Sequence, residues 1–189
     1  MKRFILGIAV FVASQTAFAD NQGFYAGGSI GQSKFIDQCA GTITCSDTDT
    51  AVKIFGGYQF TENWGAEASY VDFGKFTATA FIGVPVNVTA KANGFQLAGT
   101  GTIPVNNQFS FFGKAGIFLG RLDNSGSVGG TSVSVSGSST TFSFGVGAKW
   151  NIVDRFAVRL EFERFSKVGS DASGTSDIDL ISVGASYRF

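Results

Sequence analysis

The sequence predicts an all-β fold, an eight-stranded antiparallel up-and-down β-barrel whose strands cross a membrane. Three features predict it. Apolar and polar residues alternate through eight segments, the connections between these segments alternate between short and long, and the charges within the segments lie on the side opposite the apolar residues. All three are expected of a sheet that closes on itself, with one face against lipid and the other toward its interior.

The N-terminus has the pattern of a secretory signal peptide. Lys2 and Arg3 precede an apolar run from Phe4 to Ala13, and Ala17-Phe18-Ala19 places small residues at a cleavage site. The run is shorter than the roughly 20 residues of a membrane-spanning helix. We therefore expect residues 1–19 to be a cleaved signal peptide and residues 20–189 to form one outer-membrane β-barrel domain.

The charge balance argues against a nucleic-acid partner. Removal of Lys2 and Arg3 reduces the 14 basic residues to 12, against 14 acidic residues. The remaining chain contains no block of basic residues that could neutralise a run of phosphates. We expect no nucleic acid among the partners.

Alternation with a period of two defines the eight predicted strands. A strand of about 9 to 11 residues suffices for a tilted crossing of the hydrocarbon layer. Aromatic residues gather near the strand ends, as expected of interfacial belts. The predicted segments are 23–33, 50–60, 64–73, 93–103, 109–119, 142–150, 156–162 and 181–189.

The connections differ in length on the two sides of the predicted barrel. Short turns are expected at 61–63, 104–108 and 151–155, and long loops at 34–49, 74–92, 121–140 and 165–177. Outer-membrane barrels have short turns on the periplasmic side and long loops outside the cell. Within the third long loop, "TSVSVSGS" is expected to extend the flanking hairpin above the membrane.

Charged residues within the strands are predicted to point into the barrel. A lysine or arginine that faces lipid near the midplane costs about 2–4 kcal/mol, whereas opposite charges inside a narrow barrel can pair. Two interpretations remain open, a salt-bridged polar plug and a gated ion path. The predicted interior polar network consists of Lys53, Glu67, Lys114, Lys149, Arg159, Glu161 and Glu163.

Three large apolar residues also fall on the inward side. Phe55, Phe112 and Phe118 do not suit a wholly polar interior. Small inward residues could make room for their rings, among them Gly57, Gly116, Gly145 and Gly147.

Cys39 and Cys45 are the only two cysteines, and we expect them to form a local disulfide in the first long loop. No metal site is expected, because there is no histidine to complete one. The same absence removes the usual general base of barrel enzymes that cut acyl chains or peptides. We therefore predict a protein that is not an enzyme and needs no cofactor.

Several stretches together resemble the OmpA-like and OmpX-like eight-stranded outer-membrane barrels of Gram-negative bacteria. They are "IFGGYQFTENWGAEASYVDFG" (54–74), "NGFQLAGTGTIPV" (93–105), "RFAVRLEFERF" (155–165) and "ISVGASYRF" (181–189). The resemblance implies location in the cell outer membrane and contact with outer-membrane lipid and lipopolysaccharide. It also implies that Tyr187 and Phe189 belong to a sorting signal read by the outer-membrane assembly machinery.

The resemblance extends to part of the family's interior ion pairs. Glu67 and Arg159 match the family's central pair, whereas Thr100 and Lys149 stand where its lysine and second glutamate would be. Because the chain stops at Phe189, we expect the barrel domain alone, without the peptidoglycan-binding domain that follows the barrel in many relatives.

These observations predict a structural or surface-interaction role, such as adhesion or envelope integrity, with a host or surface ligand at four surface loops. Two alternatives remain open. One is a narrow pore of low conductance, and the other is a soluble periplasmic β-barrel that binds an apolar ligand.

Overall fold

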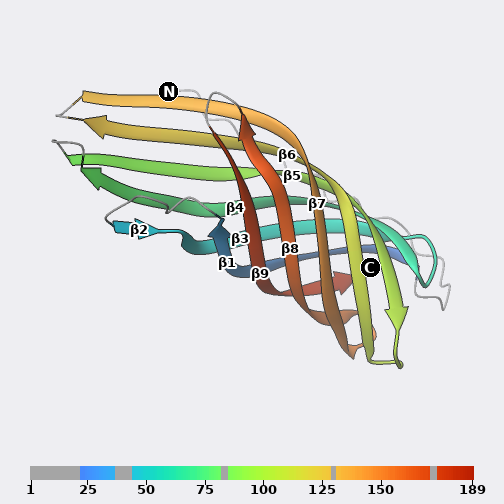
Figure 1. Ribbon diagram of the computed structural model, residues 1–189. Coiled ribbons are helices and arrows are strands. Elements are labelled where there is room, and N and C mark those ends of the chain that lie inside the picture. The colour runs from blue at the N-terminus through green and yellow to red at the C-terminus, as the bar shows by residue number, and fades with distance from the viewer. Residues whose placement is uncertain (1–21, 37–43, 82–84, 129–130, 171–173) are drawn as a thin grey trace, which may run out of the picture.

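The computed structural model describes residues 22–36, 44–81, 85–128, 131–170 and 174–189. They form an elongated barrel in which several hairpins extend well beyond one end (Figure 1). No helix among them is long and apolar enough to cross a membrane. The strands are β1 (Gly23–Phe35), β2 (Thr44–Ser46), β3 (Thr48–Gln59), β4 (Trp64–Phe81), β5 (Pro85–Pro104), β6 (Phe109–Val128), β7 (Thr131–Val153), β8 (Phe156–Ser170) and β9 (Gly174–Arg188).

Eight of these strands close into the barrel, as the sequence predicts. Each pairs antiparallel with its neighbours in the chain, and β4 pairs with β5 to join the two ends of the strand order. The last strand closes on the first, from Tyr25↔Arg188 to Phe35↔Ile178. Closure pairs the backbone polar groups that would otherwise be left at a sheet edge in hydrocarbon. The short β2 stands outside the barrel, and among the described residues it pairs with Thr77–Thr79 of β4 alone.

An outward apolar belt marks the part of the barrel that lies in the membrane. Phe95 is paired with both Tyr70 and Leu119, so these three side chains stand at one height on adjacent strands. The next outward positions toward the long hairpins are polar: Asp72, Asn93 and Arg121. β8 and β9 change in the same way, because Phe162 and Ile181 form one pair and Arg164 and Asp179 the next. This row is the outer boundary of the hydrocarbon region.

The boundary predicts where a new charge is tolerated. Leu160 lies within the belt and is 58% exposed. Replacement of Leu160 by arginine is expected to lower the free energy of unfolding by about 2–4 kcal/mol, because the guanidinium would face hydrocarbon. Equilibrium urea unfolding from lipid vesicles measures this loss. Arg164 provides the matched control, because it lies on the same face as Leu160, two outward positions further along β8 and outside the belt. Arg164→Leu is expected to change the free energy of unfolding by less than about 1 kcal/mol. Equal losses in the two variants would place the boundary elsewhere.

The predicted long loops are largely strand, which corrects their expected boundaries. β4 and β5 remain paired to Phe81↔Pro85, and β6 and β7 to Val128↔Thr131. β8 and β9 likewise pair as far as Ser170↔Gly174. The prediction for "TSVSVSGS" is confirmed, since residues 131–138 belong to β7. Membrane thickness sets a minimum length for a strand but no maximum, and a ladder can continue in water wherever its residues suit a sheet.

The outer part of the barrel interior is an apolar core, a feature that alternation in the sequence does not predict. Phe73, Phe118 and Phe165 are fully buried and meet edge to face, with ring centroids 4.8–5.6 Å apart. Above the membrane the outside of the barrel meets water, so the interior can bury apolar side chains as a soluble protein does. The buried apolar cluster comprises Phe35, Ala51, Val71, Phe73, Ala90, Ala92, Phe118, Leu122, Phe165, Val168, Ile178 and Leu180.

Glycine makes room for the inward aromatic rings, as the sequence suggests, although largely at other positions. A Cβ atom at Gly27 would lie 2.6 Å from the Phe55 ring, and one at Gly147 would lie 2.5 Å from the Phe112 ring. Such contacts are far shorter than van der Waals separation. Of the four glycines named from the sequence, Gly147 is the one that accommodates one of the three inward phenylalanines.

Candidate functional site: the charged interior

Six of the seven predicted interior residues meet in the middle of the barrel. Strand alternation directs them inward from β3, β4, β6 and β8, and their side chains are at most 6% exposed. Three are cations and three are carboxylates, so the group is neutral. We call it the charge cluster: Lys53, Glu67, Lys114, Arg159, Glu161 and Glu163.

Glu161 is the centre of the charge cluster because it contacts all three cations. One carboxylate oxygen lies 2.7 Å from Lys114 Nζ and 3.0 Å from an Arg159 guanidinium nitrogen. The other lies 2.6 Å from Lys53 Nζ. Charge-assisted contacts of this length are strong where water is excluded.

The other two carboxylates complete the cluster. Glu67 accepts from Arg159 at 2.7 Å through one oxygen and from Lys114 at 3.2 Å through the other. Glu163 lies 2.6 Å from Lys114 Nζ and also pairs with Lys53. Each of the six carboxylate oxygens in the cluster therefore has a cationic partner.

Neutral polar side chains form hydrogen bonds at the edges of the charge cluster. Gln96 donates to Glu163 at 3.2 Å and to Ser143 at 2.9 Å, and it accepts from Ser69 at 2.9 Å. Tyr25 donates its hydroxyl to Glu67 at 3.1 Å. Buried charges cost little only when such hydrogen bonds and ion pairs replace their hydration.

Aromatic rings enclose Arg159 on the side toward the short turns. Its guanidinium carbon lies 4.3 Å from the centroid of the Phe55 ring and 4.6 Å from that of Phe112. Cation–π attraction explains why these two phenylalanines fit among charges. Together with the apolar core beyond the other side of the cluster, they surround the charges with close-packed rings.

The structure corrects the prediction for Lys149. None of the ion pairs formed by the described residues includes Lys149. It is paired in register with Arg159, one cation beside another, and lines a pocket at the short-turn end with Arg188. Parity predicts that a side chain points inward, but it does not give the height at which the side chain meets a partner.

Two further sequence predictions concern the end of β9 and the cysteines. Tyr187 and Phe189 are 43% and 54% exposed on the outward face at the end of β9. Phe189 also donates its backbone N–H to Phe24 at 3.0 Å, which ties the last residue to the first strand. Cys39 and the side chain of Cys45 lie outside what the structure describes, so the disulfide stays a prediction.

The hydrogen-bonded chain of Ser69, Gln96 and Ser143 is not predicted from the sequence. Their inward parity was visible, but serine and glutamine at inward positions are common in any polar barrel. Only the register shows that they stand at the height of Glu163.

A family comparison places the chain among known proteins: the family described as the OmpA-like transmembrane domain matches residues 19–189. The chain belongs to this family. Members are outer-membrane barrels, and the chain is therefore an all-β protein of the Gram-negative outer membrane.

Curated relatives agree with the family assignment. Outer membrane protein A of Klebsiella pneumoniae is 32% identical over 96% of this chain and 54% of its own length. The corresponding protein of Klebsiella aerogenes is 30% identical over 100% of this chain and 56% of its own length. The chain thus spans about half the length of the curated relatives that it matches.

Solved structures show the same fold at lower sequence identity. Ail, the attachment invasion locus protein of Yersinia pestis, matches with a TM-score of 0.59 and 20% identity, over 89% of this chain and 99% of its own. Neisserial surface protein A matches with a TM-score of 0.55 and 12% identity, over 88% and 97%. These OmpA-like and Ail-like relatives are consistent with a structural or surface role. Outer-membrane location brings the apolar belt into contact with lipid, and it excludes the soluble periplasmic barrel considered above.

Proposed function

We propose that this chain is a non-enzymatic surface-interaction protein that binds an extended segment of a partner by adding it to a sheet edge. The observation behind the proposal is the outer half of β7. Its pairing with β6 continues to Val128↔Thr131, whereas its pairing with β8 begins only at Ser143↔Phe165. Among the described residues, Thr131–Ser138 therefore has a backbone partner on one side only.

The free edge belongs to a sheet that stands above the membrane. β4, β5, β6 and β7 stay paired far beyond the outward apolar belt and reach to one side of the barrel in Figure 1. β2 covers part of the opposite edge, on β4. A hydrogen bond of 3.0 Å from the Gly169 N–H to the Ser139 hydroxyl marks where β7 leaves its contact with β8.

The residues of this edge suit strand addition. "TSVSVSGS" (131–138) contains no charge and no proline, and Val135 is 43% exposed. Natural proteins usually protect free edges with charges, proline or a cover, so an unprotected one is an available docking site. The expected partner is an extended, uncharged segment in which β-branched residues alternate with small ones.

Charge argues against a polyanionic partner as the main ligand. Ail of Yersinia pestis has been solved in complex with the heparin analogue sucrose octasulfate. In this chain, the described residues beyond the membrane boundary include as many carboxylates as cations, which gives no excess of positive charge to attract a polyanion. They are Lys34, Lys75, Lys91, Arg121, Arg164 and Lys167, against Asp47, Asp49, Asp72, Asp123, Asp177 and Asp179.

The packing of the interior supports an anchoring role for the barrel. An ion path needs hydrated groups, but the charge cluster has every carboxylate oxygen paired, and an apolar core lies above it. The low-conductance pore is accordingly the less favoured alternative.

We further propose that residues 1–19 are removed on export and that Tyr187 and Phe189, exposed at the end of β9, are read by the assembly machinery.

Peptide selection tests the proposed edge. The full chain in lipid nanodiscs is panned against a phage library of ten-residue peptides, and we expect enrichment of sequences with alternating β-branched residues. Successive N–H groups of a strand point to opposite edges. Of the two variants Val135→Pro and Ser136→Pro, only one therefore removes a donor from the free edge. That variant is expected to weaken binding of the enriched peptides by at least about tenfold.

Threonine at the same two positions is the matched control, because Val135→Thr and Ser136→Thr keep the backbone N–H and the strand preference. Both should bind as the parent does. Unchanged affinity in both proline variants would contradict strand addition, and so would enrichment of highly charged sequences.

A further inference from the structure

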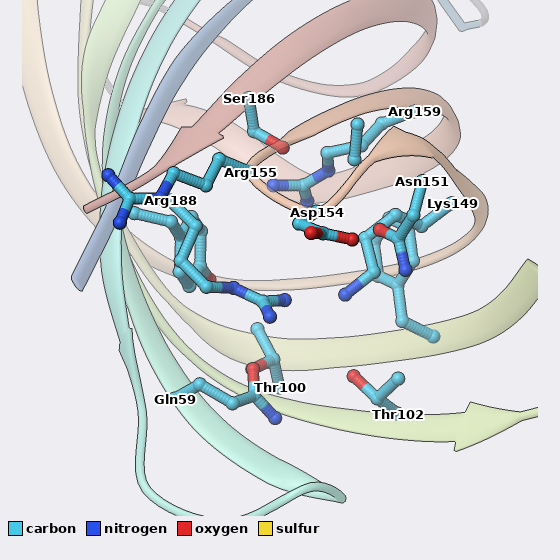
Figure 2. A pocket seen from close by; sticks show the side chains of 13 residues that line it. Gln59, Thr100, Thr102, Lys149, Asn151, Asp154, Arg155, Arg159, Ser186 and Arg188 are labelled. Carbon is cyan, nitrogen blue, oxygen red and sulfur yellow. The ribbon is translucent and has the colours of Figure 1, made fainter. Parts of the chain in front are cut away.

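A second site lies at the short-turn end of the barrel, on the periplasmic side of the charge cluster. The pocket there offers about 40 Å³ of space to the centre of a water molecule. Figure 2 shows Lys149, Arg155 and Arg188 around it, with Thr100 and Thr102 on the facing strand. We call it the periplasmic pocket, and nothing in the proposed surface interaction uses it.

The periplasmic pocket has an excess of positive charge. Four cations line it, Lys149, Arg155, Arg159 and Arg188, and the single carboxylate in its wall is the exposed Asp154. Glu67 and Glu161 neutralise Arg159 from the other side. Lys149 forms none of the ion pairs among the described residues, and its register neighbour on β8 is another cation, Arg159. Lys149 therefore has no counter-charge among the described residues, and an anion in the pocket would supply one.

Buried donors in the pocket wall also lack partners. Arg159 Nε and Thr100 Oγ1 are inaccessible to solvent and have no hydrogen-bond partner among the described residues. Both residues are 5% exposed, and both line the pocket. Because neither atom is accessible to solvent, an anion in the open part of the pocket would not contact them, and the cations that it can reach include Lys149 and Arg188.

We propose that the periplasmic pocket binds a phosphate group. Lys149 on β7, Arg188 on β9 and Thr102 on β5 line it from different strands, and donors arriving from several directions suit a tetrahedral oxyanion better than a planar carboxylate. The open mouth faces the periplasm, where the phosphate can be a free ion or part of a lipid headgroup of the inner leaflet.

Calorimetry on the refolded full chain tests the proposal. The protein is held in octyl glucoside micelles, which contain no phosphate, and sodium phosphate is titrated at constant ionic strength. We expect saturable binding with a dissociation constant of about 1 mM or tighter. Lys149→Met should weaken it at least about tenfold, because it removes the charge and keeps an unbranched side chain only one atom shorter. Lys91→Met, on the protruding sheet, is the matched control and should bind phosphate unchanged.

Two further arms complete the test. Arg155→Gln on the exposed turn should also weaken binding and does not disturb a barrel strand, so the test does not depend on the folding of the Lys149 variant. Dihexanoyl phosphatidic acid and free phosphate both contain the proposed group. The ligand that binds the protein more tightly identifies whether the phosphate comes from a lipid headgroup or from the free ion. Absence of saturable phosphate binding overturns the proposal, as does equal affinity in Lys149→Met, Arg155→Gln and the parent.

Discussion

Replacement of Glu161 by glutamine is expected to lower the free energy of unfolding by about 3–5 kcal/mol, since it leaves three buried cations facing two carboxylates. Glu161 contacts Lys53, Lys114 and Arg159, and its side chain is 2% exposed. Glutamine keeps the shape, so the loss reports charge and not volume. Equilibrium urea unfolding from phospholipid vesicles, followed by the fluorescence of Trp64 and Trp150, provides the measurement.

Two controls separate the charge cluster from general effects of mutation. Glu62→Gln removes a carboxylate from an exposed turn and should change stability by no more than about 0.5 kcal/mol. The double variant Lys53→Met with Glu161→Gln restores neutrality, and its loss should be smaller than the sum of the two single losses by about 0.5–3 kcal/mol. Strictly additive losses would show that the charges do not interact as a unit.

Truncation of Phe165 to alanine should cost about 3–5 kcal/mol, because the cavity that it leaves lies inside the apolar core. Its ring centroid is 4.8 Å from that of Phe73 and 4.9 Å from that of Phe118, and the side chain is fully buried. The same urea unfolding experiment measures the loss. A result below about 1 kcal/mol would mean that the outer part of the barrel interior is not packed.

The matched variants for this prediction test volume and location. Phe165→Leu keeps much of the ring's volume and should lose less than about 1.5 kcal/mol. Val135→Ala removes apolar atoms from an exposed position on the protruding sheet and should lose no more than about 0.5 kcal/mol. A Val135 effect as large as that of Phe165 would indicate a general response of the fold to truncation.

The sequence predicted the barrel itself because the physics of a membrane wall is local. Ile54 and Lys53 are neighbours in the chain, yet one is 62% exposed and the other 1%. Alternation alone assigns them to opposite faces, and the bilayer requires a closed sheet with apolar residues outside. The outward positions of Tyr187 and Phe189, the short turns and the pairing of the last strand with the first follow from the same rule.

The outer end of the barrel was predicted less well because the rule changes at the membrane boundary. Beyond Arg121 and Arg164 the outside meets water, and apolar residues such as Leu122 and Val168 turn inward. The alternation continues there, but with the opposite assignment of its apolar side. Loop boundaries set by membrane thickness alone therefore fall too early.

What the sequence determined by itself is the side of the wall on which each strand residue lies, and from this the fold, the membrane belt and the inward direction of seven charged residues. What only the tertiary structure decided is which of those residues meet. Strand register and tilt set the height of each side chain in the barrel, and they bring Glu161 to three cations while leaving Lys149 beside Arg159 and Arg188 at the periplasmic mouth. Register depends on pairing between distant segments, so no single stretch of the chain encodes it.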